Sequence, residues 1–158
     1  MIDNAVPLAD SFRAAGAAVV LVHVATSPDG GDWLRAQVDE PSRCVSCPPT
    51  WPRSWPSWGP RRATSWWRSA GGGVLHGTDL DLHLRRRGII MVVLGGIATT
   101  YGVESTARDG YERGYQLVLV EDAMSARSAS DHAFAFARIF PRIGRVCQTD
   151  DVIAGLGT

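Results

Sequence analysis

Apolar and polar positions along the first part of the chain predict a helix followed by a strand. Residues 3–16 place Val6, Ala9 and Phe12 at helical spacing, and the stretch ends in a glycine that is a good helix stop. Residues 17–26 then form an almost continuous apolar run rich in valine. Such a run is typical of a strand buried on both faces of a parallel sheet.

The second half of the chain repeats this alternation of helix and strand. The patterns predict helices at 78–88, 103–114, 128–141 and 150–156, and strands at 89–96, 115–123 and 144–149, whereas 31–40 fits a helix or a lid loop. Alternation of this kind indicates an α/β fold, with a parallel sheet and helices on both of its faces. Ligands in such folds bind beyond the carboxyl ends of the strands, where segments 24–31, 94–102 and 120–126 are expected.

Residues 44–73 interrupt the pattern within what we expect to be one domain spanning 1–158. This Trp/Pro/Arg-rich segment holds five of the six tryptophans and five of the nine prolines, and it has neither a helical nor a strand period. One interpretation is a disordered or aromatic binding loop. The other is translation in an alternate reading frame, because back-translation with a one-base shift permits an amphipathic helix at 50–60 and a buried strand at 63–69.

Composition argues against several classes of partner. The chain has 16 basic residues, all arginine, and 16 acidic residues, so its formal net charge of zero gives no reason to expect nucleic acid or an anionic membrane. No apolar run approaches the ~18 residues of a membrane span. The three cysteines and the absence of an export signal predict reduced thiols and a cytoplasmic location.

The cysteines themselves give no strong functional signal. Cys44 and Cys47 have the spacing of a redox or zinc pair, but the chain has no second pair that would complete four metal ligands. We expect Cys147, in the last short strand, to be a small core residue. Neither a metal nor a cofactor is predicted.

The glycine-rich stretch GGIATTYGVESTARDGYERGYQLVLVEDAMSA, residues 95–126, resembles the signature of the isochorismatase-like hydrolase family. That signature, in a family that belongs to the cysteine hydrolase superfamily, usually reads G-V-A-T-D-x-C-V-x-x-T-A, followed by G-Y and D-A. The resemblance extends over 4–43 and 74–158. It implies a three-layer, Rossmann-like α/β/α sandwich around a parallel sheet, whose first strand we expect to be missing because the chain opens in the helix that follows it.

The resemblance also implies a catalytic arrangement. The family's cysteine hydrolases use a Cys that attacks an amide carbon, an Asp that takes the thiol proton and a Lys that supports the charges. A backbone pocket beside a cis peptide stabilises the oxyanion. Here the cis peptide would join Ile97 to Ala98, and the donors would be the N–H groups of Ala98 and Gly102.

This chain departs from that arrangement at all three catalytic positions. Gly102 stands at the Cys position, Ser69 stands at the Lys position, and Asp3 does not match the Asp. In the alternate frame the codon of residue 69 is compatible with lysine. True isochorismatases, which this chain resembles in its Gly102, cleave a vinyl ether by acid catalysis without a covalent intermediate.

Two functions therefore stay open. The first is a hydrolase that cleaves a vinyl ether or an amide of a small molecule. The second is a non-catalytic remnant, or pseudoenzyme, that binds a small molecule or a partner subunit. Because no acid is visible at the strand ends, we expect negligible turnover from the chain as written. Apolar surface exposed by the missing strand predicts a homo-oligomer.

Several further side chains are candidates for the site. Thr99 and Tyr101 flank the turn and could line a pocket, and His76 lies near its expected mouth as a substrate contact. Asp122 closes a strand at the ligand-facing edge, where a structural role in holding the loops is favoured over acid catalysis.

The remaining histidines are expected to have structural or surface roles. His23 lies on a predicted buried strand and should be a core histidine, while His83 and His132 lie on predicted helices as surface residues.

Overall fold

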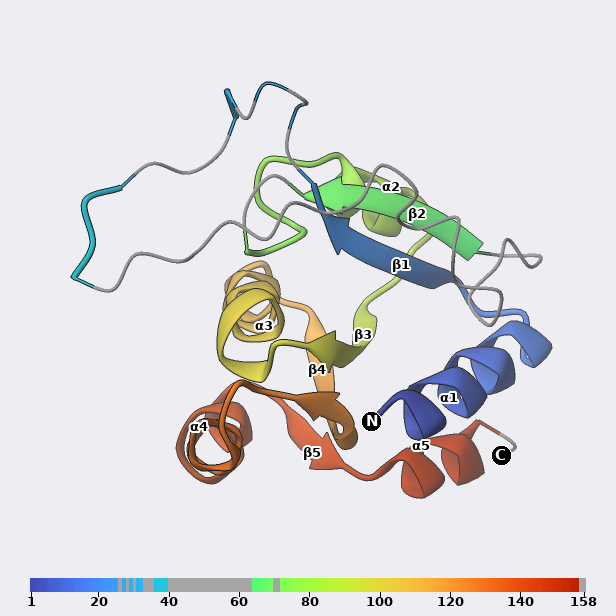
Figure 1. Cartoon of the computed structure of the whole chain (residues 1–158). Helices are drawn as coiled ribbons and strands as arrows, with labels where there is room; N and C mark the ends of the chain where they lie inside the picture. Colours follow the sequence, from blue (N-terminus) through green and yellow to red (C-terminus); the bar gives the residue numbers. More distant parts are fainter. Residues whose placement is uncertain are drawn as a thin grey trace.

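The computed structural model describes residues 1–25, 27, 29, 31, 32, 36–39, 64–69 and 72–156. Figure 1 shows its elements, which in chain order are α1 (Ile2–Ala14), β1 (Val19–Val24), β2 (Thr64–Ser69), α2 (Leu80–Arg86), β3 (Met91–Ile97), the π-helical turn η2 (Thr99–Val103), α3 (Glu104–Glu112), β4 (Gln116–Ser125), α4 (Ala129–Phe134), η3 (Ala135–Ile139), η4 (Phe140–Arg142), β5 (Arg145–Cys147) and α5 (Thr149–Gly155). Cys44, Cys47 and the predicted helix at 50–60 lie outside the described residues.

The described strands form two parallel sheets. β1 pairs with β2, with Val19 opposite Thr64 and Val24 opposite Ser69. β4 lies between β3 and β5 and runs parallel to both. The α/β class with parallel strands is thereby confirmed. The sheet is nevertheless split, because no described strand joins β1 to β3, and Figure 1 shows the β1–β2 pair separated from the other three strands.

Helices cover both faces of β4 because its side chains alternate between two apolar clusters. Leu117 and Leu119 pack in the first cluster, together with residues of α2, α3 and η3. Val118 and Val120 pack in the second cluster against Leu8 of α1 and residues of α5. β4 is therefore the middle layer of an α/β/α sandwich, as the alternating pattern predicted.

Some predicted elements differ from the observed ones. Thr64–Ser69 is a strand although the sequence around it has no strand period, because hydrogen bonding to β1 uses the backbone and needs no side-chain pattern. The helix predicted at 128–141 is instead α4, the π-turn η3 and the 3₁₀ turn η4, which contains Pro141. The described residues of 31–40 contain neither strand nor helix.

Candidate active site

The turn after β3 forms the centre of the candidate site. The Ile97–Ala98 peptide bond is cis. The carbonyl oxygen of Ala98 accepts hydrogen bonds from the N–H groups of Tyr101 at 3.0 Å and Val103 at 3.3 Å. These bonds wind the chain into η2, which leads without a break into α3. The turn therefore presents its backbone at the carboxyl end of β3, where α/β folds bind ligands.

Gly102 lies against the backbone of another segment. A Cβ atom built on Gly102 would lie 2.7 Å from the carbonyl oxygen of Gly72, well inside ordinary van der Waals distance. Thr106 holds the glycine in place, because its hydroxyl donates to the Gly102 oxygen at 2.7 Å and accepts from the Val74 N–H at 3.2 Å. The space that a cysteine side chain would need at this position is thus occupied by a carbonyl group.

Ser69 lies at the same edge of the molecule. Its side chain is buried at the end of β2, and its hydroxyl donates to the Gly73 oxygen at 2.7 Å. Gly72 and Gly73 connect it to the turn, since they contact Gly102 and the first residues of α3. The structure therefore brings Ser69 and Gly102, which the resemblance assigns to the Lys and Cys positions, to one place, with no ionisable group on either of them.

A pocket opens beside the turn. It has a volume of about 310 Å³ and is lined by residues 124–129 and by His132 of α4. Thr99, which is fully buried, is hydrogen-bonded to His132, with 2.9 Å between its Oγ1 and the Nδ1 of the imidazole. The His132 ring also contacts Phe136, at 4.7 Å between centroids. His132 is therefore half-buried at a pocket, and the expectation of a surface residue was wrong.

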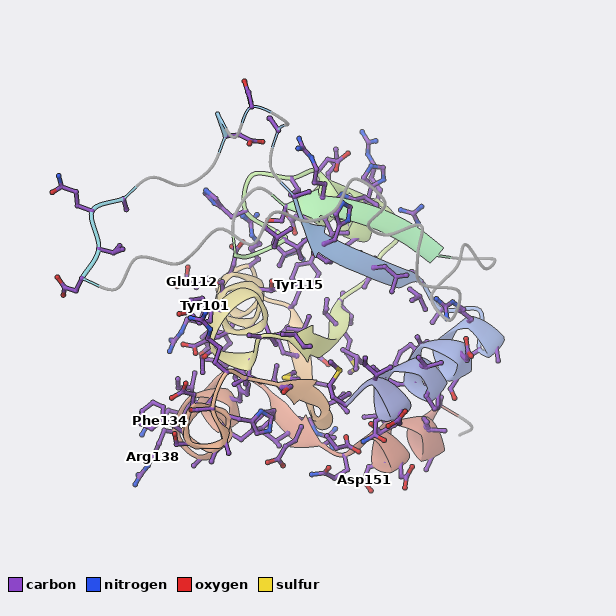
Figure 2. All side chains as sticks on the ribbon, viewed as in Figure 1. Tyr101, Glu112, Tyr115, Phe134, Arg138 and Asp151 are labelled. Carbon is purple, nitrogen blue, oxygen red and sulfur yellow. The ribbon has the colours of Figure 1, made fainter. Side chains whose placement is uncertain are left out.

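Two predicted substrate contacts lie elsewhere. Tyr101 is 54% exposed, and Figure 2 shows it with Glu112 at the periphery of the molecule beside α3. His76 is exposed in the loop before α2. Neither side chain lines the pocket of residues 124–132. Their roles in substrate binding, like those of Thr99 and of the Ala98 N–H, stay predictions.

Asp122 has a structural environment at the end of β4. Its carboxylate accepts from the Asn4 side chain at 2.8 Å, and from the N–H and hydroxyl of Thr149 at 2.9 and 2.8 Å. These contacts join α1, β4 and α5. The carboxylate thus holds three elements together, in line with the structural role expected for it.

Charged side chains also join α2 to the start of β4. Tyr115 donates to Asp81 at 2.7 Å, and Arg113 lies 3.2 Å from the same carboxylate. Burial and the bond to Asp81 raise the pKa of Tyr115 to about 12. The Tyr115 hydroxyl in turn holds the pKa of Asp81 below its usual range, with help from nearby arginines. This cluster lies away from the turn and ties secondary-structure elements together.

The other residues with candidate chemistry have ordinary environments. On β1, burial and the charge of Arg68 lower the pKa of His23, which favours a neutral imidazole, although the residue is only partly buried. His83, partly exposed on α2, lies 3.3 Å from Asp79. Cys147 packs at the margin of the second apolar cluster, as expected for a small core residue.

Across the described parts of the chain, three or more His, Cys, Asp or Glu side chains do not gather at any point that could hold a metal. Helices there are also too short or too polar to cross a membrane.

Sequence reasoning located the turn and, through segment 120–126, part of the pocket lining, but it missed the contribution of His132. The turn is encoded in one continuous stretch, whereas the pocket depends on contact between Thr99 and His132, which are 33 positions apart. A histidine on a short polar helix carries no signal in its neighbours that would distinguish it from a surface residue.

Comparisons with known proteins agree with this fold. The isochorismatase domain matches residues 1–151. The isochorismatase family protein YecD of Escherichia coli O157:H7 is 41% identical over 156 residues, which are 99% of this chain and 83% of that protein. A solved structure of an isochorismatase family protein from Burkholderia thailandensis is similar with a TM-score of 0.92 and 41% identity, covering 98% of this chain and 82% of the other. N-carbamoylsarcosine amidase from Thermoplasma acidophilum is similar with a TM-score of 0.71 and 26% identity, covering 94% and 82% of the two chains.

Proposed function

Because the chain belongs to the isochorismatase family, we propose that it is a hydrolase that acts on a small molecule without forming a covalent enzyme intermediate. The observation that carries this proposal is the contact between Gly102 and Gly72. A covalent mechanism needs a nucleophilic side chain with access to the substrate carbon. At Gly102 there is none, and the Gly72 oxygen fills the adjoining space.

The side chains around the pocket favour a carboxylated substrate. Arg127, Ser125 and Ser128 line it together with His132. A guanidinium group and hydroxyls are the donors that bind a carboxylate best, because charge-assisted hydrogen bonds are stronger than neutral ones. The supported substrate is therefore a small anionic molecule held beside the turn.

A vinyl ether fits this site better than an amide. In vinyl ether hydrolysis a proton adds to the enol carbon, water adds to the resulting oxocarbenium ion, and the C–O bond of the adduct breaks to give a ketone and an alcohol. This sequence needs an acid and a water molecule but no thiol. Because no Asp or Glu of the described residues lines the pocket to serve as that acid, we expect hydrolysis by this chain to be slow.

Isochorismate, a carboxylated vinyl ether, provides the test. We expect it to protect the amides of residues 124–132 from hydrogen exchange and to be hydrolysed slowly, without a covalent adduct in intact-protein mass spectra. Arg127→Gln should weaken binding about tenfold, or ~1.4 kcal/mol. Arg138→Gln, which changes an exposed arginine outside the pocket lining, is the matched control. Equal binding by the two variants, or an adduct formed with an amide substrate, would overturn the proposal.

A second candidate is a non-catalytic protein that binds a small molecule or a partner subunit. The burial of Ser69 and the closed space at Gly102 favour it, because both catalytic positions are filled by packing and neutral hydrogen bonds. The same experiment separates the two functions. Hydrolysis above the uncatalysed rate that falls with Arg127→Gln supports the enzyme, whereas saturable binding without acceleration supports the second candidate.

A further inference from the structure

We propose that His132 is the proton donor of the vinyl ether hydrolysis, and that Thr99 positions its imidazole. This inference rests on the function proposed above and names the residue that supplies its acid. The described residues that line the pocket are a methionine, two serines, two alanines, an arginine and His132. Of these side chains, only the imidazole readily gives and takes a proton near neutral pH.

The pocket is built where β3 and β4 end, beside the candidate turn. In the register of these two strands, Ser125 of the pocket lining is opposite Ile97, and Thr99 begins η2 two residues later. His132 comes from α4, whose first turn is capped by Ser128, because the Ser128 hydroxyl accepts an N–H group of that helix at 3.0 Å. The end of the sheet and the start of a capped helix therefore bring Thr99 and His132 together at the pocket.

The imidazole of His132 is held by two neighbours. Its Nδ1 lies 2.9 Å from the Oγ1 of Thr99, and its ring contacts Phe136 at 4.7 Å between centroids. Phe136 in turn packs edge-on against the fully buried Phe140, at 4.8 Å between centroids. These contacts engage one nitrogen and one side of the ring. Nε2, which has no hydrogen bond to any described residue, is therefore the nitrogen left for a ligand.

The bond to Thr99 decides which nitrogen moves the proton. A hydroxyl oxygen accepts hydrogen bonds, and an imidazole that donates from Nδ1 carries its second, exchangeable proton on Nε2. In the proposed arrangement the Nδ1–H group donates to Thr99 both before and after proton transfer. The buried hydroxyl thus keeps one ring orientation while Nε2 loses and regains its proton.

The substrate class is an enol ether that carries a carboxylate on the ether carbon, because Arg127 lines the same pocket. The C=C electron pair takes the Nε2 proton of the imidazolium onto the terminal carbon, which leaves an oxocarbenium ion and a neutral His132. Water adds to the cation and gives its surplus proton to Nε2. The hydroxyl proton of the resulting hemiketal passes to the ether oxygen as the C–O bond breaks. The products are a keto acid and an alcohol, and His132 is again protonated.

Hydrolysis of isochorismate by His132→Asn tests the proton donor. The asparagine amide can still donate to Thr99 but has no proton to give to carbon, so kcat should fall about 100-fold while KM stays within about threefold. His83→Asn, at a partly exposed histidine of α2 outside the pocket lining, is the matched control and should keep the kcat of the parent chain. Equal kcat in the two variants, or a loss that appears in KM alone, would overturn the proposal.

Two variants of Thr99 test the positioning role. Thr99→Val keeps the shape of this buried side chain but removes the hydroxyl, whereas Thr99→Ser keeps the hydroxyl and loses a methyl group. We expect Thr99→Val to lower kcat about tenfold with KM unchanged, and Thr99→Ser to stay within about threefold of the parent chain. A role in packing alone would produce the opposite order, so that order, or equal kcat in both variants, would overturn the role of Thr99.

The outcomes also separate this inference from the function on which it rests. If the parent chain hydrolyses isochorismate and His132→Asn does so equally well, the inference fails and the proposed hydrolase stands. If the parent chain does not exceed the uncatalysed rate, both fail. Calorimetry of isochorismate binding shows whether His132→Asn stays folded at the pocket. We expect binding like that of the parent chain, and a loss of binding would identify His132 as a contact or packing residue and overturn the proposal.

Discussion

At the scale of single residues, the lack of a Cβ atom at Gly102 shapes the candidate site. The Gly72 oxygen approaches so closely that any side chain at position 102 would displace backbone, which resists movement more than a flexible side chain does. Replacing this glycine by a cysteine is therefore not expected to create a working nucleophile, because the thiol could be accommodated only by moving the 72–73 segment.

Gly102→Ala should lower the free energy of unfolding by about 1–3 kcal/mol, the usual cost of overpacking a tight contact. Urea denaturation measures this loss. Gly155→Ala is the control, since a Cβ there meets nothing within 4 Å and the position is at the end of α5, and it should stay within about 1 kcal/mol of the parent. Equal stability of the two variants would show that the 72–73 segment yields easily.

At the scale of elements, polar side chains connect helices to strands. Asp122 joins the start of α1 and the start of α5 to the end of β4. Asp122→Ala should cost about 1–3 kcal/mol because buried donors lose their acceptor. Asp150→Ala, an exposed change in the first turn of α5, should cost less than about 1 kcal/mol. Thermal or urea unfolding measures the stability of the two variants. Similar losses of stability in both would contradict the structural role of Asp122.

The contact between α2 and β4 predicts a dependence of stability on alkaline pH. The pKa of Tyr115 is raised from 10.0 to about 12, so the folded state favours the neutral phenol. Its stabilising contribution is complete below pH 10 and is lost as the pH rises towards about 12. We expect Tyr115→Phe to cost about 1 kcal/mol at neutral pH, the usual value of one hydrogen bond, and to reduce this alkaline loss.

Unfolding by urea at several pH values between 7 and about 12 tests the expectation for Tyr115. Tyr111→Phe, at a tyrosine that is 53% exposed on α3, is the control and should leave the alkaline loss in place. Asp81 is expected to give the opposite dependence of stability on pH. Its pKa is lowered, so its contribution is present above its ordinary value of 3.8 and is lost as the pH falls below it. A stability profile unchanged by Tyr115→Phe would refute the assigned contact.

At the scale of the whole molecule, we expect the split between the sheets to favour association. Exposed apolar side chains on β1 and β3 predict that the chain alone forms a dimer or larger assembly. Light scattering measures this directly. A monomer near 17.0 kDa at all concentrations would contradict the expectation.

The order of helices and strands was predictable because local periodicity reflects which face of each element is buried. The alternation after residue 78 identified the elements from α2 to α5, and the glycine-rich stretch identified the turn that contains Gly102. The residues as written at 64–69 carry no strand pattern, and only the alternate-frame interpretation placed a strand at 63–69. These residues acquire the strand conformation of β2 through pairing with β1. The described residues of 31–40 contain no helix, so of the two alternatives left open for that stretch they follow the loop.

The amino-acid sequence by itself determined the α/β class, the family resemblance and the absence of a thiol at position 102, since each depends on residues close together in the chain. Only the tertiary structure decided that Gly72 closes the space beside Gly102, that Thr99 holds His132 at a pocket, and that the strands divide into two sheets. These features depend on contacts between distant segments, and side-chain periodicity records which face is buried but not which residue covers it.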